Sequence, residues 1–274
     1  MNKTNNHTYV ICAYKNSPYI EECIHSLKCQ KEESIIKLAT STPSSYLEDM
    51  CKRYEIDYCV RQGESGIAED WNYAYSLADT DYVTIVHQDD VYYPDYGRCV
   101  MDCMKNTDDT LIVFTDYAEL RNGTEHTGGV NLCIKRLLLV PVKRVDNNNV
   151  TWRKRFIIRF GNAICCPSVT YNKKMLDRLI AERMRDGLFH KHFRSNLDWE
   201  LWEWLSRENG RFVFVPKILM SHRIHEGSET SATLRDNERN GEDYEMFVKF
   251  WPKWLAKIIT KTYRKSEKDN IIHG

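Results

Sequence analysis

The sequence lacks an excess of charge of either sign, because its 274 residues contain 39 Lys plus Arg and 39 Asp plus Glu. Such a balance gives no overall attraction to nucleic acid, so we expect no nucleic-acid partner and only local affinity for anions. The ten cysteines include no CxxC pair, which argues against a zinc module. Their positions inside apolar runs are typical of small buried side chains in a reducing compartment.

Long apolar stretches are also missing. The first residues, MNKTNNHTYV, contain no apolar signal core. No run approaches the ~20 apolar residues that a membrane-spanning helix needs. We therefore expect a cytoplasmic protein, and the sequence leaves open peripheral attachment to the inner face of the membrane.

Short apolar runs and helical stripes alternate along the first part of the chain. Because the runs are apolar on both faces, we expect an α/β fold with a Rossmann-like, mostly parallel sheet and helices on both faces. The first helix is predicted to begin at Ser17-Pro18, with Ser17 as its N-cap. The predicted strands are residues 9–14, 34–40, 57–62, 82–86 and 111–116.

Two adjacent aspartates, Asp89 and Asp90, follow the apolar run 82–86. In open parallel sheets, ligands bind beyond the carboxyl ends of the strands, and the loops that begin near residues 13 and 40 also follow predicted strand ends. Neighbouring carboxylates repel unless a cation or hydrogen-bond donors offset their charge. The pair therefore favours a divalent metal site, with a simple Asp-rich turn as the alternative.

Four segments in a fixed order resemble the landmarks of family 2 glycosyltransferases over roughly residues 8–235. The resemblance implies a GT-A fold and an inverting sugar transfer that depends on Mn²⁺ or Mg²⁺, since hard cations prefer oxygen ligands. The expected donor is a nucleotide diphosphate sugar, UDP-sugar by default, and the expected acceptor is a glycan or lipid-linked glycan in polysaccharide biosynthesis. The segments are YVICAYKNSPYIEECIHSLKCQ, GIAEDWNYAYSLADTDYVTIVHQDD, NLDWELWEWL and SHRIHEGSETSAT.

The resemblance also assigns roles to individual residues. It implies that Asp198 is the catalytic base and that Asp89, Asp90 and His225 form the metal site. An acidic first turn of a helix after Ser195-Asn196 is the other explanation of Asp198. The remaining positions are donor-binding Ala13, Tyr14, Thr40, Asn72, Gln88 and Asp89, and acceptor-binding Gly161 and Asn162. From their chemistry, Arg223 is a candidate to hold the diphosphate and Trp199 a candidate sugar platform. The alternatives are a solvated loop for Arg223 and His225, and a place in the core for Trp199.

Several positions depart from the family pattern. His87 stands where many relatives have aspartate, Trp71 where an arginine often precedes the asparagine, and Leu197 where a glutamate precedes the base. These departures leave the donor base open among UDP, dTDP and GDP. Two other functions also stay open: a nucleotidyltransferase, although AYKNSPY has no phosphate-loop glycine, and a catalytically silent carbohydrate-binding protein.

We divide the chain into a nucleotide-sugar-binding half (1–120), an acceptor-binding half of the same domain (121–240) and a basic amphipathic C-terminal segment (241–274). Aromatic and aliphatic residues alternate with lysines over 247–268. This pattern fits a helix on an anionic membrane surface and a helix docked on the catalytic domain equally well. Residues 122–149 are open to interpretation as a hairpin, an insertion or an acceptor-side lid.

Overall fold

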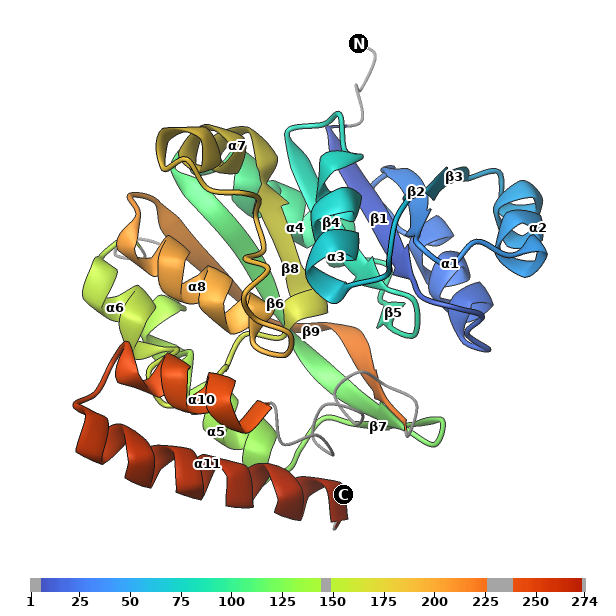
Figure 1. Cartoon of the computed structure of the whole chain (residues 1–274). Helices are drawn as coiled ribbons and strands as arrows, with labels where there is room; N and C mark the ends of the chain where they lie inside the picture. The colour runs from blue at the N-terminus through green and yellow to red at the C-terminus, as the bar shows by residue number, and fades with distance from the viewer. Residues whose placement is uncertain (1–5, 144–148, 226–238, 273–274) are drawn as a thin grey trace.

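The computed structural model of the chain describes residues 6–143, 149–225 and 239–272. One sheet forms its centre, with the strand order β3-β2-β1-β4-β8-β6-β9-β5 and with β7 paired to β6 (Figure 1). The strands are β1 His7–Ala13, β2 Ile35–Thr40, β3 Asp57–Val60, β4 Tyr82–His87, β5 Val91–Tyr92, β6 Thr110–Arg121, β7 Thr124–His126, β8 Val169–Asn172 and β9 Arg211–Ile224.

The first four strands of the sheet are parallel, as the sequence predicts. In their register Ala13 pairs with Thr40, and Cys12 pairs with His87. The carboxyl ends of β1, β2 and β4 therefore lie at one edge of the sheet. Because ligands bind beyond such an edge, the loops that follow these strands are placed to form a common site.

The second half of the sheet is mixed. β8 runs antiparallel between β4 and β6, while the long strand β9 runs parallel to β6. The register between β6 and β9 shifts where Thr115 pairs with Val215 and Asp116 pairs with Ile218. Pro216 lies in this irregularity, which suits a residue that has no N–H to donate to a neighbouring strand. The long β9 brings residues near position 222 back to the edge where β4 ends.

Helices cover both faces of the sheet, as predicted. One core cluster contains residues of α1, α2, α4 and α5. The other contains residues of α3, α7, α8, α10 and α11, so it unites all three segments into which the sequence was divided. The helices are α1 Ile20–Lys28, α2 Ser45–Tyr54, α3 Ile67–Ser76, α4 Tyr96–Lys105, α5 Val130–Leu138, α6 Thr151–Phe156, α7 Lys173–Glu182, α8 Leu197–Arg207, α10 Arg239–Val248 and α11 Lys253–Ile272, with the 3₁₀ turns η1 Val140–Val142 and η3 Cys166–Ser168.

Helix α1 begins later than the sequence predicts. Its N-cap is Tyr19, and no side chain caps it. Ser17 instead accepts a hydrogen bond from the Tyr19 N–H at 3.2 Å. The serine and proline therefore form the turn that precedes the helix, and the predicted N-cap is wrong by two residues.

Residues 122–143 contain a hairpin and a helix. Asn122 and Gly123 have positive φ angles of 49° and 79°, which gives the tight turn between β6 and β7. After the hairpin, α5 and η1 return along the acceptor half. Residues 144–148 of the segment that the sequence left open lie outside the described residues.

The C-terminal segment forms two helices rather than one. The interruption falls between Val248 and Lys253, around Pro252. The Phe247 side chain is fully buried, and its ring lies 5.0 Å from Trp199 and 5.5 Å from Tyr263. The docked alternative is therefore confirmed for this aromatic side, while Trp254 and Ile258 remain exposed. Among the described residues, we find no helix with the length and apolar character needed to cross a bilayer.

Candidate functional site

The loops after β1 and β2 are joined by hydrogen bonds beyond the strand ends. Thr40 Oγ1 accepts from the Thr42 N–H at 3.0 Å, and Thr42 Oγ1 accepts from the Lys15 N–H at 2.6 Å. Ala13 and Thr40 are buried, so they shape this edge mainly through the backbone. Tyr14 is 42% exposed, which leaves its ring available to pack on a nucleobase.

Gln88 connects the aspartate motif to the end of β1. Its Nε2 donates to the Tyr14 carbonyl oxygen at 2.9 Å. Its Oε1 is buried and has no hydrogen-bond partner within the described part of the chain. Because an unpaired buried acceptor is costly, this oxygen is a good candidate for a contact with bound donor.

Asp89 and His225 meet although they are far apart in the sequence. Asp89 follows β4 and His225 follows β9, and the His225 Nε2 lies 2.9 Å from Asp89 Oδ2. The Tyr19 ring lies 5.1 Å from the His225 ring and forms one side of this contact. The geometry brings together two residues that the sequence predicts as metal ligands. The motif residues 226–233, which follow His225, lie outside the described residues.

Asp90 is fully buried behind Asp89. Its Oδ1 accepts hydrogen bonds from His222 Nδ1 at 3.0 Å and from the Arg223 N–H at 2.9 Å. Burial alone would lower the pKa of His222, but the charge and hydrogen bond of Asp90 outweigh it and raise this pKa above 6.5. Asp90 therefore fixes the end of β9 against the aspartate motif.

His87 is influenced by the charges of both the aspartate motif and Asp198. Burial lowers the pKa of His87, although the negative charges of Asp90, Asp89 and Asp198 all act to raise it. The Nε2 of His87 is buried without a hydrogen-bond partner among the described residues. Its ring stacks on Trp71, with the ring centres 5.3 Å apart. Two of the departures from the family pattern, His87 and Trp71, are thus packed against each other.

The carboxylate oxygens of this site are suitable ligands for a hard divalent cation. Asp90 Oδ2 is buried, and the described residues offer it no hydrogen bond; such an oxygen is stabilised by a nearby cation. No cluster of three or more metal-binding side chains occurs in residues 6–143, 149–225 and 239–272. Mg²⁺ and Mn²⁺ are commonly held by one or two carboxylates together with substrate phosphates, so a partial protein set fits this use.

Arg223 is held in place by three partners. Its guanidinium pairs with Glu22, donates to the Asp89 carbonyl oxygen at 2.8 Å and lies 4.2 Å from the centre of the Tyr19 ring. The side chain is also almost fully buried. The structure therefore gives Arg223 a role in fixing Asp89, whereas the predicted contact with a diphosphate stays a prediction.

Asp198 lies in the first turn of α8. Its Oδ2 accepts from Asn162 Nδ2 at 2.5 Å, and its Oδ1 accepts from the Trp199 N–H at 2.8 Å. The sequence predicts an N-cap at Ser195-Asn196, and Asn196 occupies that position but makes no side-chain capping bond. Asp198 is thus an acidic residue in the first turn of a helix, as one explanation of its position requires. That place does not prevent it from acting as the catalytic base, because the helix N-terminus stabilises the ionised carboxylate.

The predicted acceptor residues differ in exposure. Trp199 has no exposed surface, and its Nε1 donates to the Ile158 carbonyl oxygen at 2.9 Å. The side chain is therefore packed in the core, and its predicted contact with the acceptor stays a prediction. Gly161 has a φ of +144°, and a Cβ there would lie 2.5 Å from the Tyr263 ring. Glycine is required at this position because α11 approaches so closely.

Both polar atoms of the Asn72 side-chain amide form hydrogen bonds with the backbone of one loop residue, Phe189. Its Nδ2 donates to the Phe189 carbonyl oxygen at 2.8 Å, and its Oδ1 accepts from the Phe189 N–H at 2.9 Å. Phe189 in turn packs against Trp71, with ring centres 5.0 Å apart. Asn72 thus fixes the loop at Phe189, and its predicted contact with the donor stays a prediction.

The sequence analysis missed an ion pair at the end of β3. Arg61 Nε lies 2.7 Å from Asp70 Oδ1, and Ser41 donates to Asp70 Oδ2 at 2.8 Å. The position of Arg61 directly after a predicted strand was the available signal. This group lies where a nucleotide base or ribose is expected in such folds.

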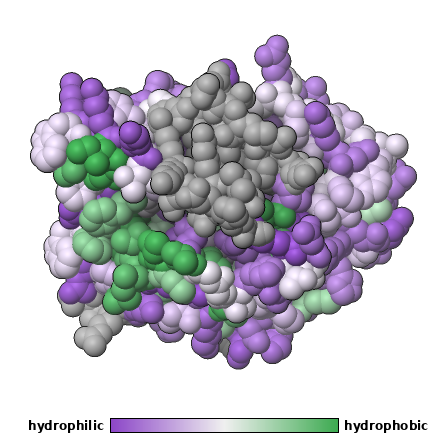
Figure 2. All heavy atoms as spheres, turned by 90° about the horizontal axis from the view of Figure 1, so that it is seen from below, coloured by the Kyte–Doolittle hydropathy of each residue, from purple (hydrophilic) through white to green (hydrophobic). Residues whose placement is uncertain are grey.

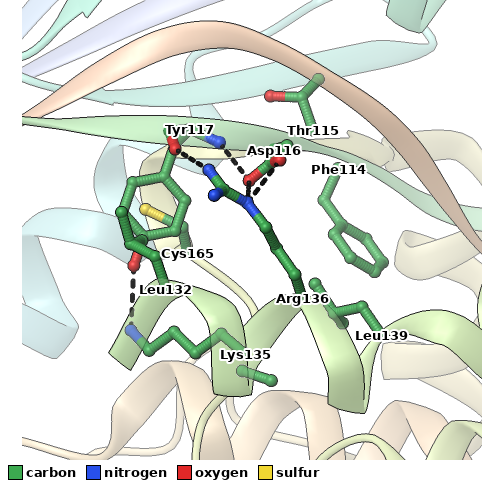
Figure 3. A pocket seen from close by; sticks show the side chains of 10 residues that line it. Phe114, Thr115, Asp116, Tyr117, Leu132, Lys135, Arg136, Leu139 and Cys165 are labelled. Carbon is green, nitrogen blue, oxygen red and sulfur yellow. Dashed lines mark hydrogen bonds and ion pairs between the residues drawn. The ribbon is translucent and has the colours of Figure 1, made fainter. Parts of the chain in front are cut away.

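The sequence analysis also missed a group of polar contacts between α5 and β6, next to the site. Lys135 of α5 donates to the Tyr117 hydroxyl at 3.0 Å, and Arg136 holds Asp116 through its Nε at 2.8 Å and 3.0 Å (Figure 3). The cavity between them measures about 10 Å³, enough for one water molecule. The Tyr117 ring lies 6.3 Å from the His222 ring, so α5 supports the Asp90 contact.

The comparisons with known proteins agree with the predicted family. The family model described as Glycosyl transferase family 2 matches residues 8–166. No curated protein matches the sequence.

Two solved structures show the fold. The crystal structure of S. aureus TarS 1–349 in complex with UDP-GlcNAc has a TM-score of 0.64 at 15% identity, over 93% of this chain and 70% of that one. The mannosyltransferase PcManGT from Pyrobaculum calidifontis, in complex with GDP-Man and Mn²⁺, has a TM-score of 0.65 at 12% identity, over 93% and 69%. The chain spans 42% of a longer TarS chain. The predicted GT-A fold is therefore confirmed.

Proposed function

Because the chain belongs to glycosyl transferase family 2 and is a glycosyltransferase, we propose that it is an inverting, metal-dependent enzyme. It transfers a sugar from a nucleotide diphosphate sugar to a hydroxyl of a glycan or lipid-linked glycan. UDP-sugar is the first choice of donor, although the two similar structures carry UDP-GlcNAc and GDP-Man respectively. Polysaccharide biosynthesis at the inner face of the cytoplasmic membrane is the setting that we propose for the reaction.

One observation carries the proposal: Asp89 after β4 meets His225 after β9 at 2.9 Å, and the neighbouring Asp90 has a buried Oδ2 that has no hydrogen bond within the described residues. Asp89, Asp90 and Asp198 all act on the pKa of His87, although more than a hundred residues separate Asp198 from the other two. In the proposed reaction Asp89 and Asp90 act at the diphosphate, and Asp198 acts at the attacking hydroxyl. The leaving diphosphate and the attacking hydroxyl must lie on opposite sides of the sugar's anomeric carbon.

Asp198 performs the proton transfer in this proposal. Its carboxylate accepts the proton of the acceptor hydroxyl while the oxygen forms a bond to the anomeric carbon. The bond from that carbon to the diphosphate breaks, and the nucleoside diphosphate leaves with the electron pair. Asn162 holds the base through one oxygen, and a single displacement inverts the anomeric centre.

The donor end is held by residues from three strand ends. Asp89, Asp90 and His225 would hold Mn²⁺ or Mg²⁺, which when bound neutralises the charge that develops on the diphosphate. The Tyr14 ring packs on the nucleobase of the nucleotide sugar, and Gln88 Oε1 accepts a hydrogen bond from this substrate. The fixed position of Asp89, held by Arg223 at its carbonyl oxygen, limits the reorganisation that binding requires.

A thermal-shift panel tests the donor and the metal together. UDP, dTDP, GDP and CMP are each measured with and without Mn²⁺. We expect one nucleoside diphosphate to raise the melting temperature by roughly 5–10 °C near saturation, and only with the metal, because a ligand that binds the native state alone stabilises it.

Two variants separate binding from chemistry. Asp89→Ala is expected to lose the metal-dependent shift. The matched variant Asp198→Asn is expected to keep the shift and lose sugar transfer by about a hundredfold or more, because it lacks only the base. A wild-type protein that is folded and responds to none of the nucleotides would favour a silent carbohydrate-binding protein. Release of pyrophosphate from a nucleoside triphosphate would favour a nucleotidyltransferase.

A further inference from the structure

Apolar side chains are exposed on the lower side of the molecule, on α5 and α11. Val130 and Leu137 of α5 are 77% and 70% exposed, and Trp254 and Ile258 of α11 are 67% and 57% exposed. Both helices lie at the lower side of the view in Figure 1, and Figure 2 shows apolar residues gathered on the left of that side. We define the apolar face by these residues and two more that are half exposed: Val130, Ile134, Leu137, Val140, Trp254 and Ile258.

The exposed residues of α5 form a regular stripe. Val130, Ile134 and Leu137 are separated by four and three residues, so they lie on one side of the helix. Leu132, on another side, is buried in the core. The helix therefore does not need the exposed stripe for docking, and a cluster of this kind marks a surface that another partner covers.

Helix α11 has three distinct sides. Ala256 and Thr260 are buried against the domain. Trp254 and Ile258 are exposed, and beside them Lys253, Lys257 and Lys261 form a basic row with the spacing of one helical turn. Within the described residues, no acidic side chain pairs with any of these three lysines, in contrast to the ion-paired Lys52 of α2.

The charge around the apolar face is one-sided. Residues 127–164 and 249–264 together contain thirteen Lys and Arg and a single acidic residue, Asp146, whereas the whole chain has 39 of each sign. The two segments supply α5, η1, α6 and most of α11. Because the whole chain is neutral, the remainder of the sequence is correspondingly acidic. The basic excess therefore lies in the segments that carry the exposed apolar residues, although Lys154 is buried and Arg136 pairs with Asp116.

We propose that the apolar face and the lysine row of α11 bind the surface of an anionic lipid bilayer. Apolar side chains enter the boundary between headgroups and acyl chains, while lysines keep their charge among the lipid phosphates. A second copy of the chain is the less suitable occupant, because a symmetric contact would bring the two basic surfaces together.

This orientation places the acceptor side of the site near the lipid. Tyr263 of α11 contacts Gly161, and the next residue, Asn162, donates to Asp198. A bilayer under α11 would therefore lie on the side where a lipid-linked acceptor presents its hydroxyl group. This last step depends on the proposed function, whereas lipid binding itself does not.

Vesicle flotation of the full chain tests the proposal. We use vesicles of phosphatidylcholine alone and vesicles with equal amounts of phosphatidylcholine and phosphatidylglycerol. We expect the protein to float with the mixed vesicles, and to do so less in high salt, because salt screens the lysines. Absence of binding to the mixed vesicles, or equal binding to both kinds, would overturn the proposal.

Matched variants locate the surface. Leu137→Ser and Trp254→Ser are each expected to lower partitioning about tenfold, and Lys257→Glu about fivefold or more. Met184→Ser and Lys174→Glu are the controls, because both residues are exposed on or beside α7, which lies at the top of Figure 1. The proposal fails if the controls lose binding to the same extent, or if the face variants keep it.

Two further measurements separate the alternatives. Light scattering of the wild type should report a monomer, and a dimer that Leu137→Ser dissociates would assign the face to a second copy. All variants should keep the metal-dependent nucleotide shift, because none of them lies at the donor site. If the wild type shows no metal-dependent nucleotide shift, the proposed function is contradicted, while the result on lipid binding still holds.

Discussion

At the scale of single residues, buried polar groups at the sheet edges fall into two kinds. Arg223 and the Oδ1 atom of Asp90 fix neighbouring chain segments through hydrogen bonds. His87 Nε2 and Gln88 Oε1 are buried at the site without partners among the described residues. Unpaired groups of the second kind are costly to keep, so they are the positions at which a bound donor is expected to add hydrogen bonds.

A buried histidine makes the stability of the fold depend on pH. His7 of β1 lies 2.9 Å from both Ser34 Oγ and Thr84 Oγ1 through its two ring nitrogens, and burial lowers its pKa to about 3. The unfolded chain binds a proton near pH 6.5, whereas the folded chain does not. The free energy of unfolding should therefore fall by about 1.4 kcal/mol for each pH unit below 6.5, until the pH reaches the folded pKa.

Urea unfolding at a series of pH values checks this expectation. His7→Gln can still hydrogen-bond to the hydroxyls but does not titrate. Below pH 6.5 the free energy of unfolding of this variant should therefore fall less steeply with falling pH than that of the wild type, by the contribution of one proton. His126→Gln, at an exposed position on β7, is the control and should follow the wild type. Equal pH dependence in the wild type and His7→Gln would contradict the assignment.

At the scale of elements, the start of α8 depends on a helix that comes later in the chain. The Glu242 carboxylate of α10 accepts hydrogen bonds from the backbone N–H groups of Arg194, Ser195 and Asn196, at 2.7 Å, 2.9 Å and 3.0 Å. Asn196 Nδ2 also donates to Asp243 at 2.9 Å. These contacts replace an ordinary side-chain cap and fix the turn that carries Asp198.

Removal of this carboxylate should affect both stability and catalysis. We expect Glu242→Ala to lower the free energy of unfolding by about 1–3 kcal/mol, because it leaves backbone donors without partners. It should also slow transfer more than it weakens donor binding, because it loosens the turn with the base. Glu245→Ala, on the same helix but bonded to the exposed His192, is the control. Equal effects of the two variants in urea unfolding and transfer assays would refute the role of Glu242.

At the scale of the whole molecule, the C-terminal helices belong to the catalytic core on one side and face outward on the other. The core cluster that contains Trp199 also includes Phe247 and Ala256. The opposite side of α11 carries Trp254 and Ile258. A single helix therefore joins the folded core to the surface that we propose for lipid binding.

A pair of substitutions on α11 tests this division. Ala256→Glu would bury a charge in the core, so we expect it to detach α11 and to lower the free energy of unfolding by about 3 kcal/mol or more. Ile258→Glu, only two residues further, should leave stability within about 0.5 kcal/mol of the wild type, because the position is exposed. Urea unfolding measures both. Similar losses for the two variants would show that the exposed side also contributes to the fold.

Much of the N-terminal half could be predicted from the sequence, because buried parallel strands and amphipathic helices produce local patterns. The strands at 82–87 and 35–40 lie within a residue or two of the predicted limits. The first residue of α1 was harder to predict from the sequence, since Ser17 and Pro18 suit a turn as well as a helix cap. The antiparallel β8 was also beyond local pattern, because strand direction depends on which neighbours a strand finds.

The sequence by itself determined the family, the aspartate motif after a buried strand and the amphipathic character of the C-terminal segment. These features depend on residue type and spacing alone. Only the tertiary structure decided that His225 meets Asp89, that Trp199 is buried and that apolar side chains of α5 and α11 are left exposed. Each of these depends on segments distant in the chain, and the free energy of packing the whole core, rather than any local preference, selects which of them come together.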